Sequence, residues 1–154
     1  MTVRFEVTTP IAATAEVVFD LSLDIDAHLG SMAASGEQAI GGVTSGPIGL
    51  GEEVTWRARH LGIWWTMTSR VTELDRPRRF VDEQVRGPFA RFHHEHRFVA
   101  GDGAHTEMTD VVTFTAPAGP IGVAAEALVL RRLLTALIEE RGRYLKTEAE
   151  RRPS

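Results

Sequence analysis

The chain concentrates its histidines in one short segment, FARFHHEHRF at residues 89–98, where His93, His94, Glu95 and His96 follow one another. An imidazole exchanges protons near neutral pH and is a common ligand of metal ions, so chemistry is expected here first. The aromatic residues of the segment predict a strand. Three interpretations follow: a metal site, a proton relay, or an ordinary strand with histidine on both faces.

Side chains alternate between the two faces of a strand, so residues two apart share a face. One face carries the aromatic residues and is formed by Phe92, His94, His96 and Phe98. The opposite face carries the charges and is formed by Arg91, His93, Glu95 and Arg97. We therefore expect His94 and His96 to point into the protein, and His93 and Glu95 to be solvated without a functional role.

An acidic partner for the inward histidines is expected in the next strand-like segment, residues 105–115. The apolar face of this segment comprises Met108, Asp110, Val112 and Phe114. A carboxylate raises the proton affinity of an imidazole and burial lowers it, so both protonation states stay open. A neutral imidazole could act as a general base, whereas an imidazolium held by Asp110 would anchor an anionic or carbonyl group. A pair that only stabilises the sheet is a further alternative.

The segments that must position these side chains begin with a strand at residues 3–9, where apolar and polar residues alternate and Pro10 is expected to end the strand. Over residues 14–32 the apolar residues recur at every third and fourth position, with Thr14 as a plausible N-cap. This spacing predicts two short helices, divided near Ser22.

The glycine-rich residues 36–50 favour a strand and a turn, and they lack the Lys-Ser/Thr ending of a phosphate-binding loop. Five strand-like segments follow at close spacing, which favours an antiparallel meander: 52–60, 63–74, 78–86, 90–99 and 105–115. An Ala/Leu/Glu/Arg-rich stretch over residues 120–149 predicts one long helix that starts at Gly119-Pro120.

Length and composition predict a single domain over residues 1–150 with a short polar tail at 151–154. The 17 basic and 21 acidic residues are spread along the chain, which argues against nucleic acid as a partner. The lack of cysteine excludes thiolate nucleophiles and sulfur-ligated metals. No signal peptide and no apolar run of about 18–20 residues is present, so we expect a cytoplasmic protein without stable membrane insertion. A homodimer is compatible with the sequence.

Four stretches, GEEVTWRARH, RRFVDEQVRGPFARFHHEHRF, HTEMTDVVTF and GPIG, stand in an order that resembles the START-like helix-grip superfamily, also called SRPBCC. Within it the chain is similar to bacterial polyketide cyclase/dehydrase-like and lipid-transport-like members, over nearly its whole length. The resemblance implies an α+β helix-grip fold, with a curved antiparallel sheet wrapped around a long C-terminal helix and two short helices after the first strand. It also implies a cavity between the sheet and that helix.

In such a cavity we expect a small hydrophobic ligand, either a lipid, a polyketide or an aromatic metabolite. Strand parity turns Trp65 and Met67 inward and Trp64 outward. It does not resolve residues 78–86, where Gln84 is a candidate polar contact. The expected ligand-binding residues are Trp56, His60, Trp65, Met67, Gln84, Phe92, His94, His96, Met108, Asp110, Phe114, Leu130 and Leu134.

The alternative is an enzyme, a cyclase or dehydratase in which His94, His96 and Asp110 act as general acid and base. The chain has no Gly-x-Ser-x-Gly elbow, which argues against covalent catalysis. A membrane-associated accessory protein is a third alternative. Both histidines with Asp110 or His60 could hold a metal ion. However, the superfamily is not generally metal-dependent, and carboxylates and imidazoles satisfy each other without an ion, so we expect no metal and no cofactor.

Overall fold

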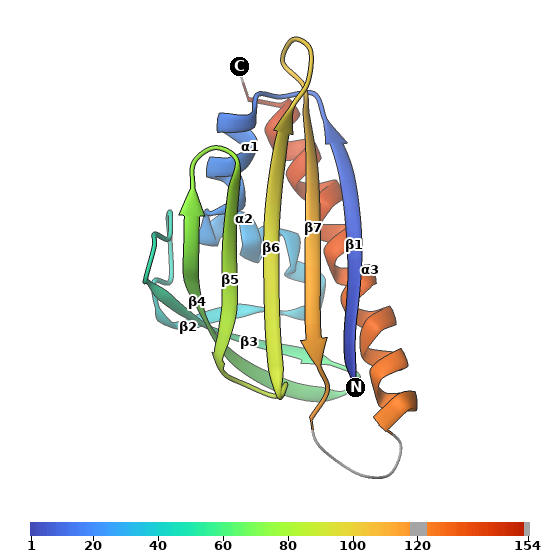
Figure 1. Cartoon of the computed structure of the whole chain (residues 1–154). Helices are drawn as coiled ribbons and strands as arrows, with labels where there is room; N and C mark the ends of the chain where they lie inside the picture. The colour runs from blue at the N-terminus through green and yellow to red at the C-terminus, as the bar shows by residue number, and fades with distance from the viewer. Residues whose placement is uncertain (118–122, 153–154) are drawn as a thin grey trace.

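The structure, a computed structural model, describes residues 1–117 and 123–152 and shows a curved antiparallel sheet packed against helices (Figure 1). The sheet has seven strands in the order β1-β7-β6-β5-β4-β3-β2. Their bounds are β1 Thr2–Ile11, β2 Gln38–Gly42, β3 Glu53–His60, β4 Ile63–Asp75, β5 Arg79–Arg86, β6 Arg91–Ala100 and β7 Thr106–Thr115. The helical segments are α1 Ala15–Ser22, α2 Ile25–Ser31, the 3-10 turn η1 Ala33–Ser35 and α3 Val123–Glu150. The predicted helix-grip fold is confirmed.

The strands from β3 to β7 form the predicted meander, in which each strand pairs antiparallel with the next along the chain. β1 forms one edge by pairing with β7, and β2 forms the other by pairing with β3. β1 continues through Pro10 to Ile11, so the prediction that Pro10 ends this strand is wrong. The proline is tolerated because an edge strand has one unpaired side, where no amide hydrogen is needed.

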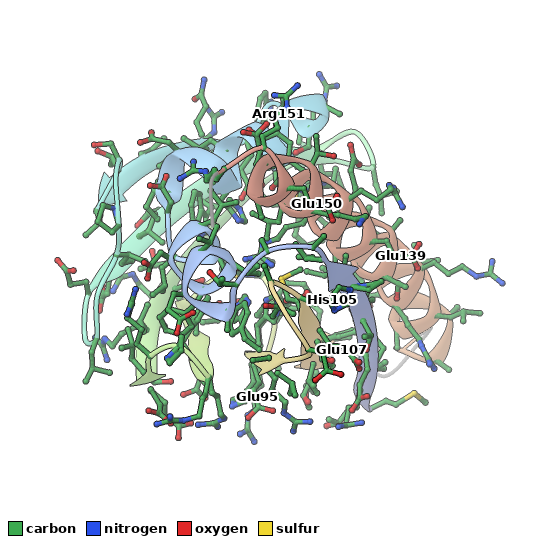
Figure 2. The ribbon with its side chains drawn as sticks, turned by 90° about the horizontal axis from the view of Figure 1, so that it is seen from above. Glu95, His105, Glu107, Glu139, Glu150 and Arg151 are labelled. Carbon is green, nitrogen blue, oxygen red and sulfur yellow. The ribbon has the colours of Figure 1, made fainter. Side chains whose placement is uncertain are left out.

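The two short helices are divided where the sequence predicts a break. Thr14 Oγ1 accepts a hydrogen bond from the Val17 amide at 3.4 Å and caps α1, as expected. Asp24 Oδ1 accepts one from the Ala27 amide at 3.0 Å and caps α2. Both helices contact α3 and lie on the same side of the sheet (Figure 2).

The long helix α3 packs against β1 on the concave side of the sheet. At Gly142 the approach is so close that a Cβ atom would lie 2.5 Å from Thr9 Oγ1. The predicted helix start at Gly119-Pro120 lies outside the described residues. Within residues 1–117 and 123–152, no helix is both long and apolar enough to cross a membrane.

The outer face of the sheet is held by ion pairs. Figure 2 shows Glu95 on the side of the sheet away from the helices. The sequence predicts a solvated Glu95, but this residue is only 9% exposed, so that prediction is wrong. Arg79 and Arg97 pair with its two carboxylate oxygens and cover it.

Candidate functional site

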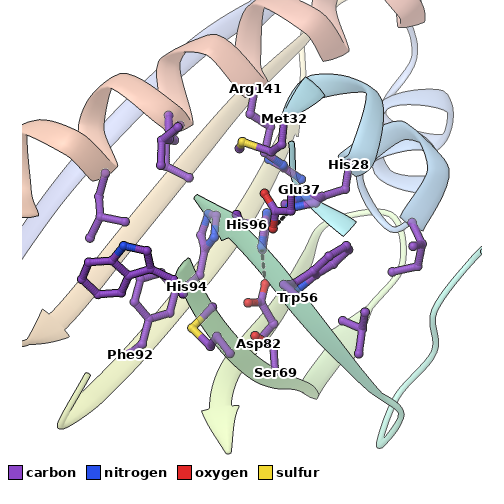
Figure 3. A pocket seen from close by; sticks show the side chains of 18 of the residues that line it. His28, Met32, Glu37, Trp56, Ser69, Asp82, Phe92, His94, His96 and Arg141 are labelled. Carbon is purple, nitrogen blue, oxygen red and sulfur yellow. Dashed lines mark hydrogen bonds and ion pairs between the residues drawn. The ribbon is translucent and has the colours of Figure 1, made fainter. Parts of the chain in front are cut away.

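A cavity of about 190 Å³ lies between the concave face of the sheet, the helix α2 and the inward side of α3 (Figure 3). Its walls include aromatic and aliphatic side chains from β3, β4, β6 and α3. Nine of the residues predicted to bind a ligand line this cavity: Trp56, His60, Trp65, Met67, Phe92, His94, His96, Leu130 and Leu134.

The other four predicted residues are not among those that line the cavity. Met108 and Phe114 are completely buried in the core, and Asp110 is completely buried behind the histidines. Gln84 is bound to the backbone of Phe89: its Nε2 donates to the carbonyl oxygen at 2.8 Å, and its Oε1 accepts from the amide at 3.2 Å. Gln84 therefore holds the turn that brings Phe89 to the cavity.

Five polar residues form a connected group, called the polar cluster below: Asp82, His94, His96, Asp110 and Arg141. His94 Nε2 lies 2.8 Å from Asp110 Oδ1, and His96 Nε2 lies 2.7 Å from Asp82 Oδ2. His96 Nδ1 is 3.2 Å from the same Asp110 oxygen, without the geometry of a hydrogen bond. The two inward histidines of β6 therefore meet one carboxylate from β7 and one from β5.

Arg141 joins α3 to the polar cluster from an otherwise apolar side of the helix. Its side chain is 3% exposed. It donates from Nη1 to Asp110 Oδ1 and from Nη2 to the Ser22 carbonyl oxygen, each at 3.3 Å. Because an unpaired buried charge is very costly, Arg141 and Asp110 make each other's burial tolerable.

The rings of the polar cluster are stacked. The centroids of His94 and His96 are 3.7 Å apart with an interplanar angle of 24°. The His96 ring also stacks on Phe80, at 3.9 Å and 13°, and these two residues are cross-strand partners of β6 and β5. The stack and the hydrogen bonds together fix how each imidazole is turned.

Burial and neighbouring charges set the protonation states of the polar cluster. Burial alone raises the pKa of Asp110, but His94, His96 and the Arg141 charge together hold that pKa well below its usual range. Burial lowers the pKa of His94, and His96 lowers it further, against the opposing effect of Asp110. Burial also raises the pKa of Asp82, yet the hydrogen bond and charge of His96 bring it below its ordinary value. Both carboxylates are therefore ionised and His94 is neutral at pH 7.

These states determine which nitrogen of His94 is basic. An ionised carboxylate only accepts hydrogen bonds, so Nε2 of His94 carries the hydrogen and donates it to Asp110. Nδ1 is then the unprotonated nitrogen of a neutral imidazole in the cavity wall. Such a nitrogen can accept a hydrogen bond or a proton from a bound molecule.

Asp82, His94 and His96 each offer one atom that could bind a metal ion, and these atoms lie within 4.8 Å of one another. The residue types suit zinc. However, Nε2 of each histidine already bonds a carboxylate, and the stacked rings keep their lone pairs in two separate, nearly parallel planes that do not meet at one point. The arrangement fits a hydrogen-bonded cluster better than an ion site.

A second polar group lies on the helical side of the cavity. His28 Nε2 lies 3.2 Å from Glu37 Oε1, and the His28 ring packs on Trp56 with 4.2 Å between centroids. His60 lines the same cavity, and burial lowers its pKa against the opposing charge of Glu37. Sequence reasoning missed His28 and Glu37, because Glu37 precedes β2 in a loop where no periodicity gives its direction.

Two members of the polar cluster were also missed. Asp82 lies in the segment whose parity did not resolve, because apolar residues stand on both faces of β5: Phe80 and Val81 are adjacent and both buried. Arg141 left a readable signal, because it stands at helical spacing between Leu137 and Leu145. A charge inside an apolar stripe indicates a buried ion pair.

Comparisons with known proteins identify the family of the chain. The family model described as polyketide cyclase / dehydrase and lipid transport matches residues 2–150. A search of curated proteins finds no match.

Solved structures share the fold at low sequence identity. The Zhui aromatase/cyclase from Streptomyces sp. R1128 is 24% identical, with a TM-score of 0.74 over 99% of this chain and 96% of its own. A START superfamily protein from Mycobacterium smegmatis is 13% identical, with a TM-score of 0.72 over 96% of this chain and 97% of its own. The di-domain ARO/CYC protein StfQ of the steffimycin pathway is 16% identical, with a TM-score of 0.77 over 98% of this chain and 51% of its own. The chain therefore belongs to the polyketide cyclase/dehydrase and lipid-transport family.

Proposed function

We propose that the chain binds a small, mainly apolar molecule in the cavity, of the class of lipids, polyketides or aromatic metabolites. The observation that carries this proposal is the cavity itself, a space of about 190 Å³ with aromatic and aliphatic walls. Its polar groups gather in the polar cluster and around His28 and Glu37. Apolar walls with a few convergent polar groups are the usual anatomy of small-molecule sites.

The size and shape of the cavity favour a compact ligand. Sites for drug-sized molecules span about 300–1,000 Å³, and this cavity is smaller. Flat side chains form part of its wall, with Trp65 and Phe89 stacked at 6.3 Å between centroids and Phe92 beside them. We therefore favour an aromatic metabolite of one or two rings over a long acyl chain.

Mass spectrometry of molecules released from the purified protein under denaturing conditions tests this proposal. An apolar molecule near one equivalent is expected from the wild type. Leu134→Trp should lose it, because Leu134 lines the cavity and the larger side chain fills the space. Leu128→Trp is the matched control, since Leu128 lies on the same helix with 51% exposure and should retain the molecule. Equal release from both variants would contradict binding in the cavity.

A cyclase or dehydratase is the second candidate, and the neutral imidazole of His94 in the cavity wall favours it. A base placed there could remove an α-proton from a bound ketone. Deuterium exchange at the α-carbon of 1-indanone, followed by NMR in D₂O, would report this step without knowledge of the natural substrate. An enzyme should accelerate the exchange, and His94→Ala should abolish the acceleration while 1-indanone still binds. No acceleration by the wild type, despite binding, would leave the carrier function alone.

A further inference from the structure

Ser69 is the starting point, because its hydroxyl group has no visible structural use. The residue is 3% exposed and lines the cavity. Its Oγ makes no hydrogen bond to any atom of the described chain. Buried hydroxyl groups are normally paired, since an unmade hydrogen bond is costly. Ser69 lines the cavity, but Oγ itself is covered in this rotamer, so a molecule in the cavity pairs with it after a rotation about the Cα–Cβ bond, which a serine makes at little cost. The unpaired hydroxyl therefore points to a bound molecule as its partner.

The neighbouring strand shows why no protein group takes this role. Ser69 on β4 is registered with Gln84 on β5, beside one of the register shifts between these strands. Irregular pairing of this kind redirects side chains and is common next to binding sites. The amide of Gln84 is committed in both directions to the backbone of Phe89, so it does not reach back to Ser69.

Asp82 supplies a second polar group on the same wall. It is the cross-strand partner of Val71, two residues from Ser69, and both Ser69 and Asp82 line the cavity (Figure 3). The hydrogen bond to His96 uses only Oδ2 of Asp82. The side chain keeps 23% exposure, so a carboxylate edge stays available to the cavity.

We propose that Ser69 and Asp82 form a subsite that recognises a hydroxyl group of the ligand, which makes a phenol or an alcohol the favoured ligand class. A carboxylate can only accept, so the ligand group must donate to Asp82, while Ser69 can either donate or accept. A hydroxyl does both at once. A ketone has no hydrogen to donate, and a carboxylate would be repelled. This inference rests on the proposed function.

Equilibrium dialysis with two probes of nearly equal shape, 2-naphthol and 2-methylnaphthalene, tests the subsite. A methyl group is more hydrophobic than a hydroxyl, so a cavity without the subsite would bind 2-methylnaphthalene more tightly. We expect the wild type to prefer 2-naphthol by about tenfold, because the hydrogen bonds to Ser69 and to the charged Asp82 together outweigh that hydrophobic difference. Ser69→Ala should reverse or abolish that preference.

Ser31→Ala is the matched control, because Ser31 is equally buried but its Oγ already donates to the His28 carbonyl oxygen at 2.7 Å. It should keep the probe preference and lower the melting temperature. Ser69→Ala should not lower the melting temperature, since it removes an unpaired group.

The outcomes separate this inference from the proposed function. A wild type that binds both probes without preferring 2-naphthol overturns the subsite and leaves the cavity function standing, and this comparison needs no variant. A preference that Ser69→Ala retains also overturns the role of Ser69. Binding of neither probe overturns the proposed function together with the subsite.

Discussion

Asp110 Oδ1 lies 2.8 Å from Nε2 of His94, and this contact decides which nitrogen of the histidine is free for a ligand. Asp110 is completely buried and ionised, so it must receive the hydrogen of Nε2. The charge of Asp110 is in turn balanced by Arg141. One carboxylate thereby fixes the tautomer of a cavity residue and anchors the long helix to the sheet.

Asp110→Asn is expected to destabilise the protein by about 3 kcal/mol, because it leaves the buried Arg141 without its counter-charge. An arginine cannot release its proton to escape that cost. Urea unfolding of the variant and the wild type measures the difference.

Asp82→Asn serves as the comparison for this prediction. It also removes a carboxylate from a histidine pair, but Asp82 keeps 23% exposure, and a histidine can give up its charge. We expect a clearly smaller loss of stability than for Asp110→Asn. Equal losses would show that Arg141 does not depend on Asp110.

Stability should decline on acidification, first through His94. Burial above all lowers the pKa of His94, so below about pH 6.5 the unfolded chain binds a proton that the folded chain does not. The free energy of unfolding therefore falls as the pH drops from about 6.5, and His60 acts in the same direction. Asp110 and Asp82 have lowered pKa values, so their contribution is lost only below about pH 3.9.

Urea unfolding at several pH values between 8 and 5 measures this decline. His94→Gln should flatten most of it, because glutamine does not titrate. A decline of unchanged size in His94→Gln would mean that His94 binds protons equally in the folded and unfolded chain, so that another group such as His60 carries the decline.

Strand parity predicted the inward side chains well where strand pairing is regular. β6 and β7 pair residue by residue without a shift, so the alternation that placed His94, His96 and Asp110 on one face holds throughout. Parity gives only the face, however. Asp110 faces inward, but His94 and Arg141 cover it, so it lies behind the cavity wall. The contact with Arg141 joins segments far apart in the sequence and cannot be read from one strand.

The same reasoning failed where apolar residues stand on both faces of a strand or where the partner lies on another element. Phe80 and Val81 are adjacent on β5 and both buried, so the alternation did not show which face carries Asp82. Ser69 lines the cavity on the same face of β4 as Met67, but the missing partner of its hydroxyl could not be read from the sequence.

Glu95 was expected to be solvated because it stands on the charged face of β6. That face is the outer one, as expected, but the side chain is buried there. It is buried because Arg97 on its own strand and Arg79 on the neighbouring strand cover it, and the Arg79 contact could not be read from one strand.

Gly142→Ala should destabilise the protein by about 1 kcal/mol, although alanine favours helices over glycine by a similar amount. The added Cβ would lie 2.5 Å from Thr9 Oγ1, and the resulting overpacking outweighs the gain. Combination with Thr9→Ala removes the colliding atom and should restore stability, as measured by a double-mutant cycle in urea. If the double variant loses as much stability as Gly142→Ala alone, a contact other than that with Thr9 Oγ1 excludes a side chain at this position.

Zinc is expected to leave the melting temperature unchanged, although Asp82, His94 and His96 offer three potential ligand atoms within 4.8 Å. A tetrahedral ion needs lone pairs that converge on one point about 2.0–2.1 Å from each nitrogen. The two imidazoles are instead stacked at 3.7 Å, and the Nε2 hydrogen of His94 is held by Asp110. The nearby charge of Arg141 opposes a second cation.

Thermal unfolding with zinc chloride and with EDTA tests this expectation. An ion at one hundred times its dissociation constant would stabilise the fold by about 2.7 kcal/mol. If such a rise occurs and His96→Ala removes it, the rings must reorient to bind zinc, and the hydrogen-bonded cluster is then the metal-free form of an ion site.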